Sequence, residues 1–145
     1  LTRHSHISNI ETKINAAIMN IQEIEKRNEK LQEQAAQCAE AVPGHNLVEY
    51  ASIIIRSMKK IDVKFPKLLQ AKSDMTFYTT LEKLEEEIDE VVYALDKLHG
   101  VNRKSEILQI NELIKNGYEL LSIYSMACDA VIEKRVKVKE QEEEL

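Results

Sequence analysis

Residues that build turns and sheets are scarce in this chain. Its 145 residues include three glycines, two prolines and no tryptophan. A sandwich or barrel of short strands needs many more turn residues than this, so an all-β fold is excluded. No stretch of 18 consecutive apolar residues is present, and no signal-peptide pattern opens the chain. We therefore expect no direct membrane insertion of this segment.

Charge of a single sign is also lacking. The chain carries 25 acidic and 20 basic residues for a net charge of −5, with both signs interspersed. This mixture argues against a surface for nucleic acid. With 43% hydrophobic and 31% charged residues, the composition is typical of a folded helical protein, and the length predicts one domain over residues 1–145. Because the chain starts with Leu1 and its last stretch still has a helical pattern, we expect it to be a piece of a longer protein.

Apolar residues between positions 7 and 42 follow one another at steps of three and four. This spacing is the signature of a helix packed lengthwise against other helices. It predicts a first helix over about 5–42, which ends at Pro43-Gly44. The stripe consists of Ile7, Ile10, Ile14, Ala17, Ile21, Ile24, Asn28, Leu31, Ala35, Cys38 and Val42.

Three further helices are predicted, over about 46–65, 74–99 and 105–143. Pro66 limits the second because proline lacks a backbone donor and clashes with the preceding turn. Gly100 suits the end of the third, since glycine accepts a left-handed conformation. Gly117 lies inside the fourth, where it indicates a kink or a close approach, with a true break as the alternative. The basic residues Lys134, Arg135, Lys137 and Lys139 are expected on a solvated face with ion pairs along the helix.

Short links make successive helices antiparallel. The sequence thus predicts an all-α protein, an up-down-up-down four-helix bundle with coiled-coil-like packing and long first and last helices. The start of the first helix and the end of the last would leave the bundle together, as a two-helix stalk. In this arrangement Cys38 and Cys128 lie about 35 Å apart along the bundle. They are therefore expected to be unpaired core residues.

Asn28 is the one strongly polar member of the first stripe. A polar residue at such a position can fix register and oligomeric state in a coiled coil. It is therefore a candidate determinant of homo-oligomerisation. The alternative is that Asn28 lies at the edge of the bundle and bonds water or a neighbouring residue.

No catalytic or cofactor motif accompanies the helical pattern. Paired inward carboxylates, Glu-x-x-His pairs and glycine-rich phosphate loops are all missing from the sequence. Among the histidines, His45 and His99 are expected in loops and His4 and His6 near a frayed end, too few together for a zinc site. We expect no enzyme activity, no cofactor and no bound metal.

These patterns favour a cytoplasmic interaction or oligomerisation module of a scaffold or adaptor protein, which binds partner helices through helix–helix contacts. A candidate partner face on the second helix consists of Ile53, Ile54, Ile55 and Met58. The alternative is an extracytoplasmic ligand-sensing domain of a membrane receptor, whose first and last helices continue into membrane spans. Apolar segments of about 20 residues flanking the chain in its parent reading frame would favour that alternative.

Overall fold

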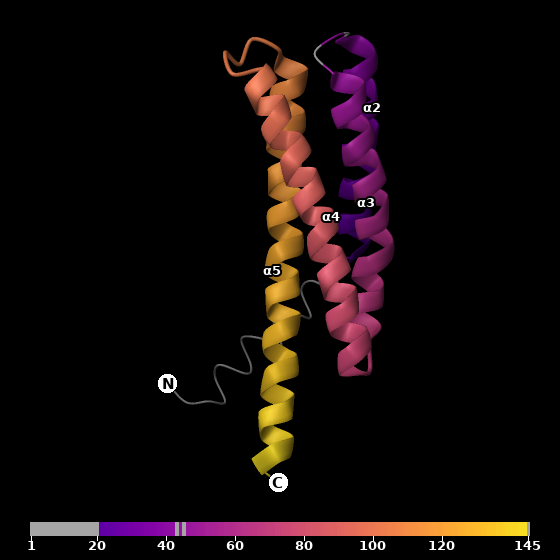
Figure 1. Ribbon diagram of the computed structural model, residues 1–145, viewed down its shortest axis with the longest axis vertical. Coiled ribbons are helices and arrows are strands. Elements are labelled where there is room, and N and C mark those ends of the chain that lie inside the picture. Colours follow the sequence, from indigo (N-terminus) through magenta and orange to yellow (C-terminus); the bar gives the residue numbers. More distant parts are fainter. Residues whose placement is uncertain (1–20, 43, 45, 145) are drawn as a thin grey trace.

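The computed structural model describes residues 21–42, 44 and 46–144, which form four helices. They are α2 (Ile21–Ala41), α3 (Leu47–Gln70), α4 (Asp74–Val101) and α5 (Leu108–Glu144). Each helix packs against the next, and α5 returns to pack against α2. The predicted up-down-up-down four-helix bundle is confirmed (Figure 1). The predicted start of the first helix near residue 5 lies outside the described residues.

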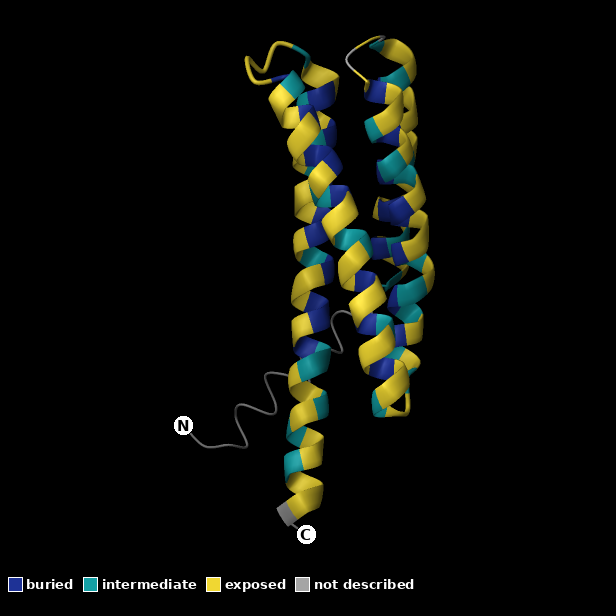
Figure 2. Cartoon of the chain, in the orientation of Figure 1, coloured by how far each residue is buried: buried dark blue, intermediate teal, exposed yellow. Residues whose placement is uncertain are grey.

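The core follows the predicted stripes. In α2 the buried residues are Ile24, Asn28, Leu31, Ala35 and Cys38, which all belong to the first stripe. Figure 2 shows the buried positions turned inward on every helix, with exposed positions on the outer faces. Spacing of three and four therefore located the core correctly within the described part of the first helix.

The end of α3 differs from the prediction. The helix passes through Pro66 and ends at Gln70, not near residue 65. A proline inside a helix removes one backbone hydrogen bond, but burial of Phe65 and Leu68, at 2% and 1% exposed, holds the last turn against the core. Tertiary packing thus overrides the local helix breaker.

The connections confirm the predicted start of α4 and correct the boundaries on either side of the link between α4 and α5. Ser73 begins α4 as a side-chain cap, since its Oγ accepts a hydrogen bond from the Thr76 amide at 3.1 Å. At its other end α4 runs through Gly100 to Val101, and α5 begins at Leu108, three residues later than predicted. The link between them folds around Asn102, whose side chain accepts from the Ile107 amide at 3.1 Å and donates to the Ile107 carbonyl at 3.0 Å.

The last helix is continuous through Gly117, so the alternative of a break is wrong. Gly117 is instead a close approach between α5 and α4, because an added Cβ would lie 2.8 Å from Leu95 Cδ1. Beyond this point α5 extends past the turn between α3 and α4 (Figure 1). We call residues 136–144 the projecting end of α5. Within the described part of the chain, none of the helices has the length and apolarity needed to cross a membrane.

Candidate helix-docking groove

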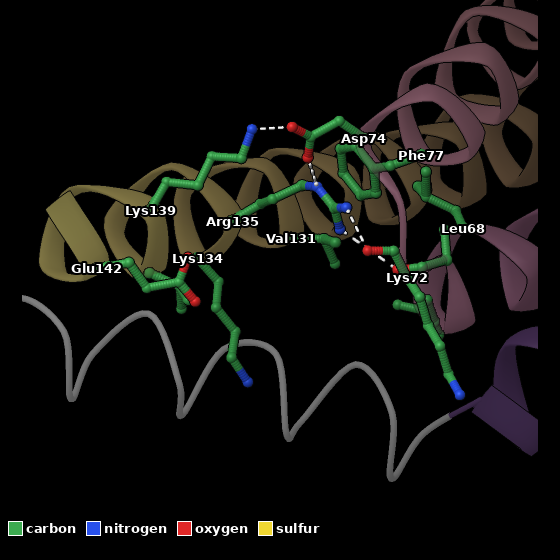
Figure 3. A pocket seen from close by; sticks show the side chains of 12 residues that line it. Leu68, Lys72, Asp74, Phe77, Val131, Lys134, Arg135, Lys139 and Glu142 are labelled. Carbon is green, nitrogen blue, oxygen red and sulfur yellow. Dashed lines mark hydrogen bonds and ion pairs between the residues drawn. The ribbon is translucent and has the colours of Figure 1, made fainter.

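A groove of about 370 Å³ lies where the turn between α3 and α4 meets α5. Figure 3 shows side chains from both parts of the fold around it. One half of the lining is charged, and it includes Arg135 with three lysines. The other half is apolar and consists of Leu68, Leu69, Ala71, Phe77, Val131 and Val138. A mixed lining of this kind suits the apolar side of an amphipathic helix with charged flanks.

Arg135 fastens α5 to the neighbouring turn. Its guanidinium donates to Asp74 Oδ1 at 3.0 Å, to the Ala71 carbonyl at 3.3 Å and to the Lys72 carbonyl at 3.1 Å. Its Cζ also lies 4.5 Å from the centre of the Phe77 ring. The carbonyls just after a helix lack helical partners, so Arg135 both satisfies the end of α3 and pairs with the start of α4 (Figure 3).

These contacts correct the expectation of a solvated basic face. Lys137 does pair along the helix, with Glu140 at 3.5 Å. Arg135 and Lys139, however, both pair with Asp74, which lies 61 and 65 residues earlier in the chain. The sequence did contain a signal for these ion pairs, since Asp74 lies at the start of the predicted helix that runs antiparallel to α5. Sequence reasoning missed it because the basic cluster was assigned to a solvated face and α5 was not aligned residue by residue with α4.

Removing the Arg135 side chain is expected to loosen this end of the bundle. Hydrogen bonds to charged groups each contribute about 1.5–3 kcal/mol, with part of that lost to solvent screening here. We therefore expect Arg135→Met to lower the free energy of unfolding by about 1–3 kcal/mol. Urea denaturation of the full chain measures this change.

The exposed Arg103, in the link between α4 and α5, supplies the control for this prediction. Arg103→Met is expected to change stability by less than about 0.5 kcal/mol. Arg135→Lys keeps the charge, but its ammonium group lacks the planar guanidinium fork that reaches three acceptors. This variant should therefore recover only part of the loss. Equal stability of the Arg135→Met and Arg103→Met variants would contradict the role given to Arg135.

Asn28 lies in a buried polar layer at the centre of the bundle. Its Nδ2 donates to the Met58 carbonyl and to the Tyr124 hydroxyl, both at 3.0 Å, and its Oδ1 accepts from Gln32 Nε2 at 2.6 Å. Asn28 is fully buried, so the bundle-edge position in the predicted alternative is wrong, although the hydrogen bonds to neighbouring residues that it included are present. These bonds join α2, α3 and α5 within one chain. Control of oligomeric state by Asn28 stays a prediction.

Burial shifts the ionisable groups around this layer. Desolvation raises the pKa of Tyr124 above its usual 10.0, so the hydroxyl is neutral. Burial, with the nearby charges of Glu25 and Glu29, also raises the pKa of the Asp62 carboxyl. Sequence reasoning missed Asp62, since one aspartate beside an apolar stripe carries no distinguishing pattern.

Both cysteines are buried and free, in agreement with the sequence prediction. Desolvation raises the pKa of the Cys38 thiol and raises that of Cys128 to about 12. Neither thiol forms a thiolate near neutral pH, and the thiolate is the reactive form. The two residues therefore serve as small apolar core groups.

The candidate partner face on α3 does not form a single exposed surface. Ile54 and Met58 are fully buried in the core. Ile53 and Ile55 are half-buried and lie about 200° apart around the helix axis, on either side of the buried stripe. In the folded bundle, Ile54 and Met58 are thus unavailable to a partner helix.

The histidines and the comparisons add no ligand site. His4, His6 and His45 lie outside the described residues, and His99 is exposed near the end of α4. Among residues 21–42, 44 and 46–144, no group of three His, Cys, Asp or Glu side chains is placed to hold a metal ion. The chain matches no family model, and comparison with curated proteins and with solved structures likewise gives no match.

Proposed function

We propose that this chain is a non-enzymatic interaction module that binds partner helices of a larger scaffold or adaptor assembly at the projecting end of α5. One observation carries the proposal. Past Arg135, which joins α5 to the turn between α3 and α4, the helix still carries exposed apolar side chains. Val136 is 41% exposed outside the groove lining, and Val138 is 43% exposed within it. On the earlier turns of the same helix, residues at this spacing are buried against α2 and α4.

The contact surface suggests what kind of partner fits. Ile132 is half-buried and Val136 exposed, and they lie four residues apart on one side of α5. Residues four apart are neighbours on a helix surface. Lys137 and Glu140 beside them offer both charge signs. A helix with a short apolar stripe and mixed charged flanks is complementary to this side.

The proposal is tested by self-association of the full chain, in which a second copy supplies the partner helix. Burying a valine contributes about 1.5 kcal/mol, and about 1.4 kcal/mol is tenfold in affinity. We expect concentration-dependent association in sedimentation equilibrium, weakened about tenfold or more by Val136→Glu.

A matched control is Val48→Glu near the start of α3, where Val48 is 68% exposed. This variant places the same charge on the bundle away from the projecting end and should leave association unchanged. A strictly monomeric chain at every concentration, or equal effects of the two variants, would overturn the proposal.

The receptor alternative draws on the same feature, because a helix that leaves the bundle at one end can continue into a membrane span. The projecting end itself is charge-dense, with Lys137, Lys139, Glu140 and Glu142–Glu144 within nine residues. The parent reading frame decides between the two proposals. Apolar segments of about 20 residues on both sides of this chain would favour the receptor, and charged helical sequence would favour the scaffold.

A further inference from the structure

The groove between α5 and the turn after α3 keeps apolar side chains within reach of solvent. Four apolar residues of its lining are half-buried or exposed, namely Leu69, Ala71, Val131 and Val138. Leu68 and Phe77 line the same groove but are buried in the core, so they lie at its floor. Because covering apolar surface removes it from water, the groove favours an occupant that inserts apolar side chains.

The charged half of the groove is basic. Its lining holds four cations and two carboxylates, a formal charge of +2, in a chain whose net charge is −5. One of the carboxylates, Asp74, is taken up by ion pairs with Arg135 and Lys139. Within the described part of the chain, the ammonium groups of Lys72 and Lys134 have no ion-pair partner.

These two lysines flank the apolar lining from different parts of the fold. Lys72 extends from the turn between α3 and α4, and Lys134 extends from α5. Figure 3 shows both ammonium groups on the same open side of the groove, away from the ion pairs of Asp74. An occupant that presents carboxylates on both sides of an apolar stripe would therefore match the groove in charge as well as in polarity.

We propose that the groove binds an acidic amphipathic helix of a partner protein. The apolar stripe of that helix covers the apolar lining, and acidic side chains on its two flanks pair with Lys72 and Lys134. Val131 and Val138 are seven residues apart, about 10 Å along α5, so the groove takes about two turns of the partner. A flat acidic membrane surface would meet the lysines without reaching Leu68 and Phe77 at the floor.

This inference goes beyond the proposed function and concerns another side of α5. Val131 and Val138 line the groove, whereas Ile132 and Val136 do not. An effect of Val136→Glu on self-association tests the proposed function and carries no information on the groove. Either idea can therefore fail while the other stands.

Two synthetic amphipathic helices of about 20 residues serve as probes, because helices shorter than about 12–15 residues are marginal in water. Both carry leucine at the a and d positions of each heptad, and one has glutamate while the other has lysine at e and g. In fluorescence anisotropy with the full chain, we expect the glutamate peptide to bind about tenfold more tightly than the lysine peptide. Equal affinity for the two peptides, or no binding of the glutamate peptide, would overturn the inference.

Charge reversal locates the binding. Lys72→Glu combined with Lys134→Glu should weaken binding of the glutamate peptide about tenfold or more. The matched control combines Lys104→Glu with Lys115→Glu, which reverses two exposed lysines towards the opposite end of the bundle. It changes the net charge by the same amount and should alter binding by less than about twofold. Equal weakening by the two double variants would contradict a site in the groove.

Two valines of similar exposure test the apolar contact. Val138→Ser should weaken binding of the glutamate peptide about three- to tenfold, since Val138 lines the groove and loses apolar contact. Val136→Ser, outside the lining, should change binding by less than about twofold. Equal effects of the two substitutions would contradict insertion of an apolar stripe into the groove.

The same charge-reversal variant distinguishes other occupants. Its binding to phosphatidylserine vesicles is measured by co-sedimentation, and its self-association by sedimentation equilibrium. Loss of vesicle binding, while neither peptide binds the wild-type chain, would assign the groove to an acidic membrane surface. Loss of self-association under the same condition would assign it to a second copy of this chain. Either result would overturn the inference.

Discussion

Replacing Asn28 by aspartate is expected to destabilise the bundle more than any other single polar change. The new carboxylate cannot donate to the Met58 carbonyl, which Asn28 reaches at 3.0 Å, and it is fully buried at 0% exposure. An uncompensated buried charge costs about 3–5 kcal/mol. We expect Asn28→Asp to lower the free energy of unfolding by that amount at pH 7, measured by urea denaturation.

The loss should depend on pH with a defined sign. Burial raises the pKa of the new carboxyl in the folded state above its unfolded value of about 3.9. The folded state then holds the proton more tightly, so stability relative to the wild-type chain is greatest below the unfolded pKa and falls as pH rises. A pH-independent loss would contradict the burial of this position.

Two controls separate charge from lost hydrogen bonds. Asn116→Asp alters a half-buried amide at the same interface between α2 and α5 and should cost clearly less. Asn28→Leu alone leaves the Tyr124 hydroxyl without this partner and should cost about 1–3 kcal/mol. Adding Tyr124→Phe removes the second polar group, so the double variant should recover much of that loss. If the stability losses of Asn28→Leu and Tyr124→Phe simply add in the double variant, the two side chains do not share a stabilising hydrogen bond.

Gly117→Leu is the second change with a large expected effect. A Cβ at this position would lie within 3 Å of both methyl groups of Leu95, and Leu95 is fully buried. Overpacking a well-filled core typically costs 1–3 kcal/mol, occasionally more. We expect a loss of about 3 kcal/mol in urea denaturation, because the buried Leu95 side chain must leave its place in the filled core or the two helices must separate around it.

Gly100, at an exposed position near the end of α4, offers a matched control. It is also helical, but no heavy atom lies within 4 Å of a Cβ built there. Gly100→Ala should therefore stabilise the protein by up to about 1 kcal/mol through helix propensity, while Gly117→Ala should not. If Leu95→Ala fails to reduce the cost of Gly117→Ala, the close approach is not the cause.

Helical spacing alone predicted most of this fold. Ile24, Leu31 and Cys38 are buried where the stripe put them, because a residue's place on a helix depends only on its number. Gly117 was also recognisable, since a glycine inside an otherwise regular stripe needs a packing reason. Local pattern therefore predicted which helices form and which faces they bury.

Features that depend on contacts between helices were harder to predict from the sequence. The end of α3 was placed too early because the burial of Leu68 outweighs the local effect of Pro66. The pairing of Arg135 with Asp74 was missed as well, because it depends on the register between α4 and α5. Ile54 was assigned to a partner-binding face but is buried in the core. Sequence alone does not distinguish an exposed isoleucine from a buried one until the neighbouring helices are placed. The Asn28 layer likewise required the register between α2 and α5.

The antiparallel pairing of α2 and α5 has a mechanical consequence. Because α2 and α5 pack in opposite directions, the start of α2 and the end of α5 lie towards the same end of the bundle. A pull on these two points therefore separates the helices from that end instead of sliding them along each other. The contacts then break one after another, with the Asn28–Tyr124 bond giving way before the Gln34–Asn116 bond. Such peeling needs far less force than breaking the same bonds together. Pulled at these points, the bundle would open stepwise at low force.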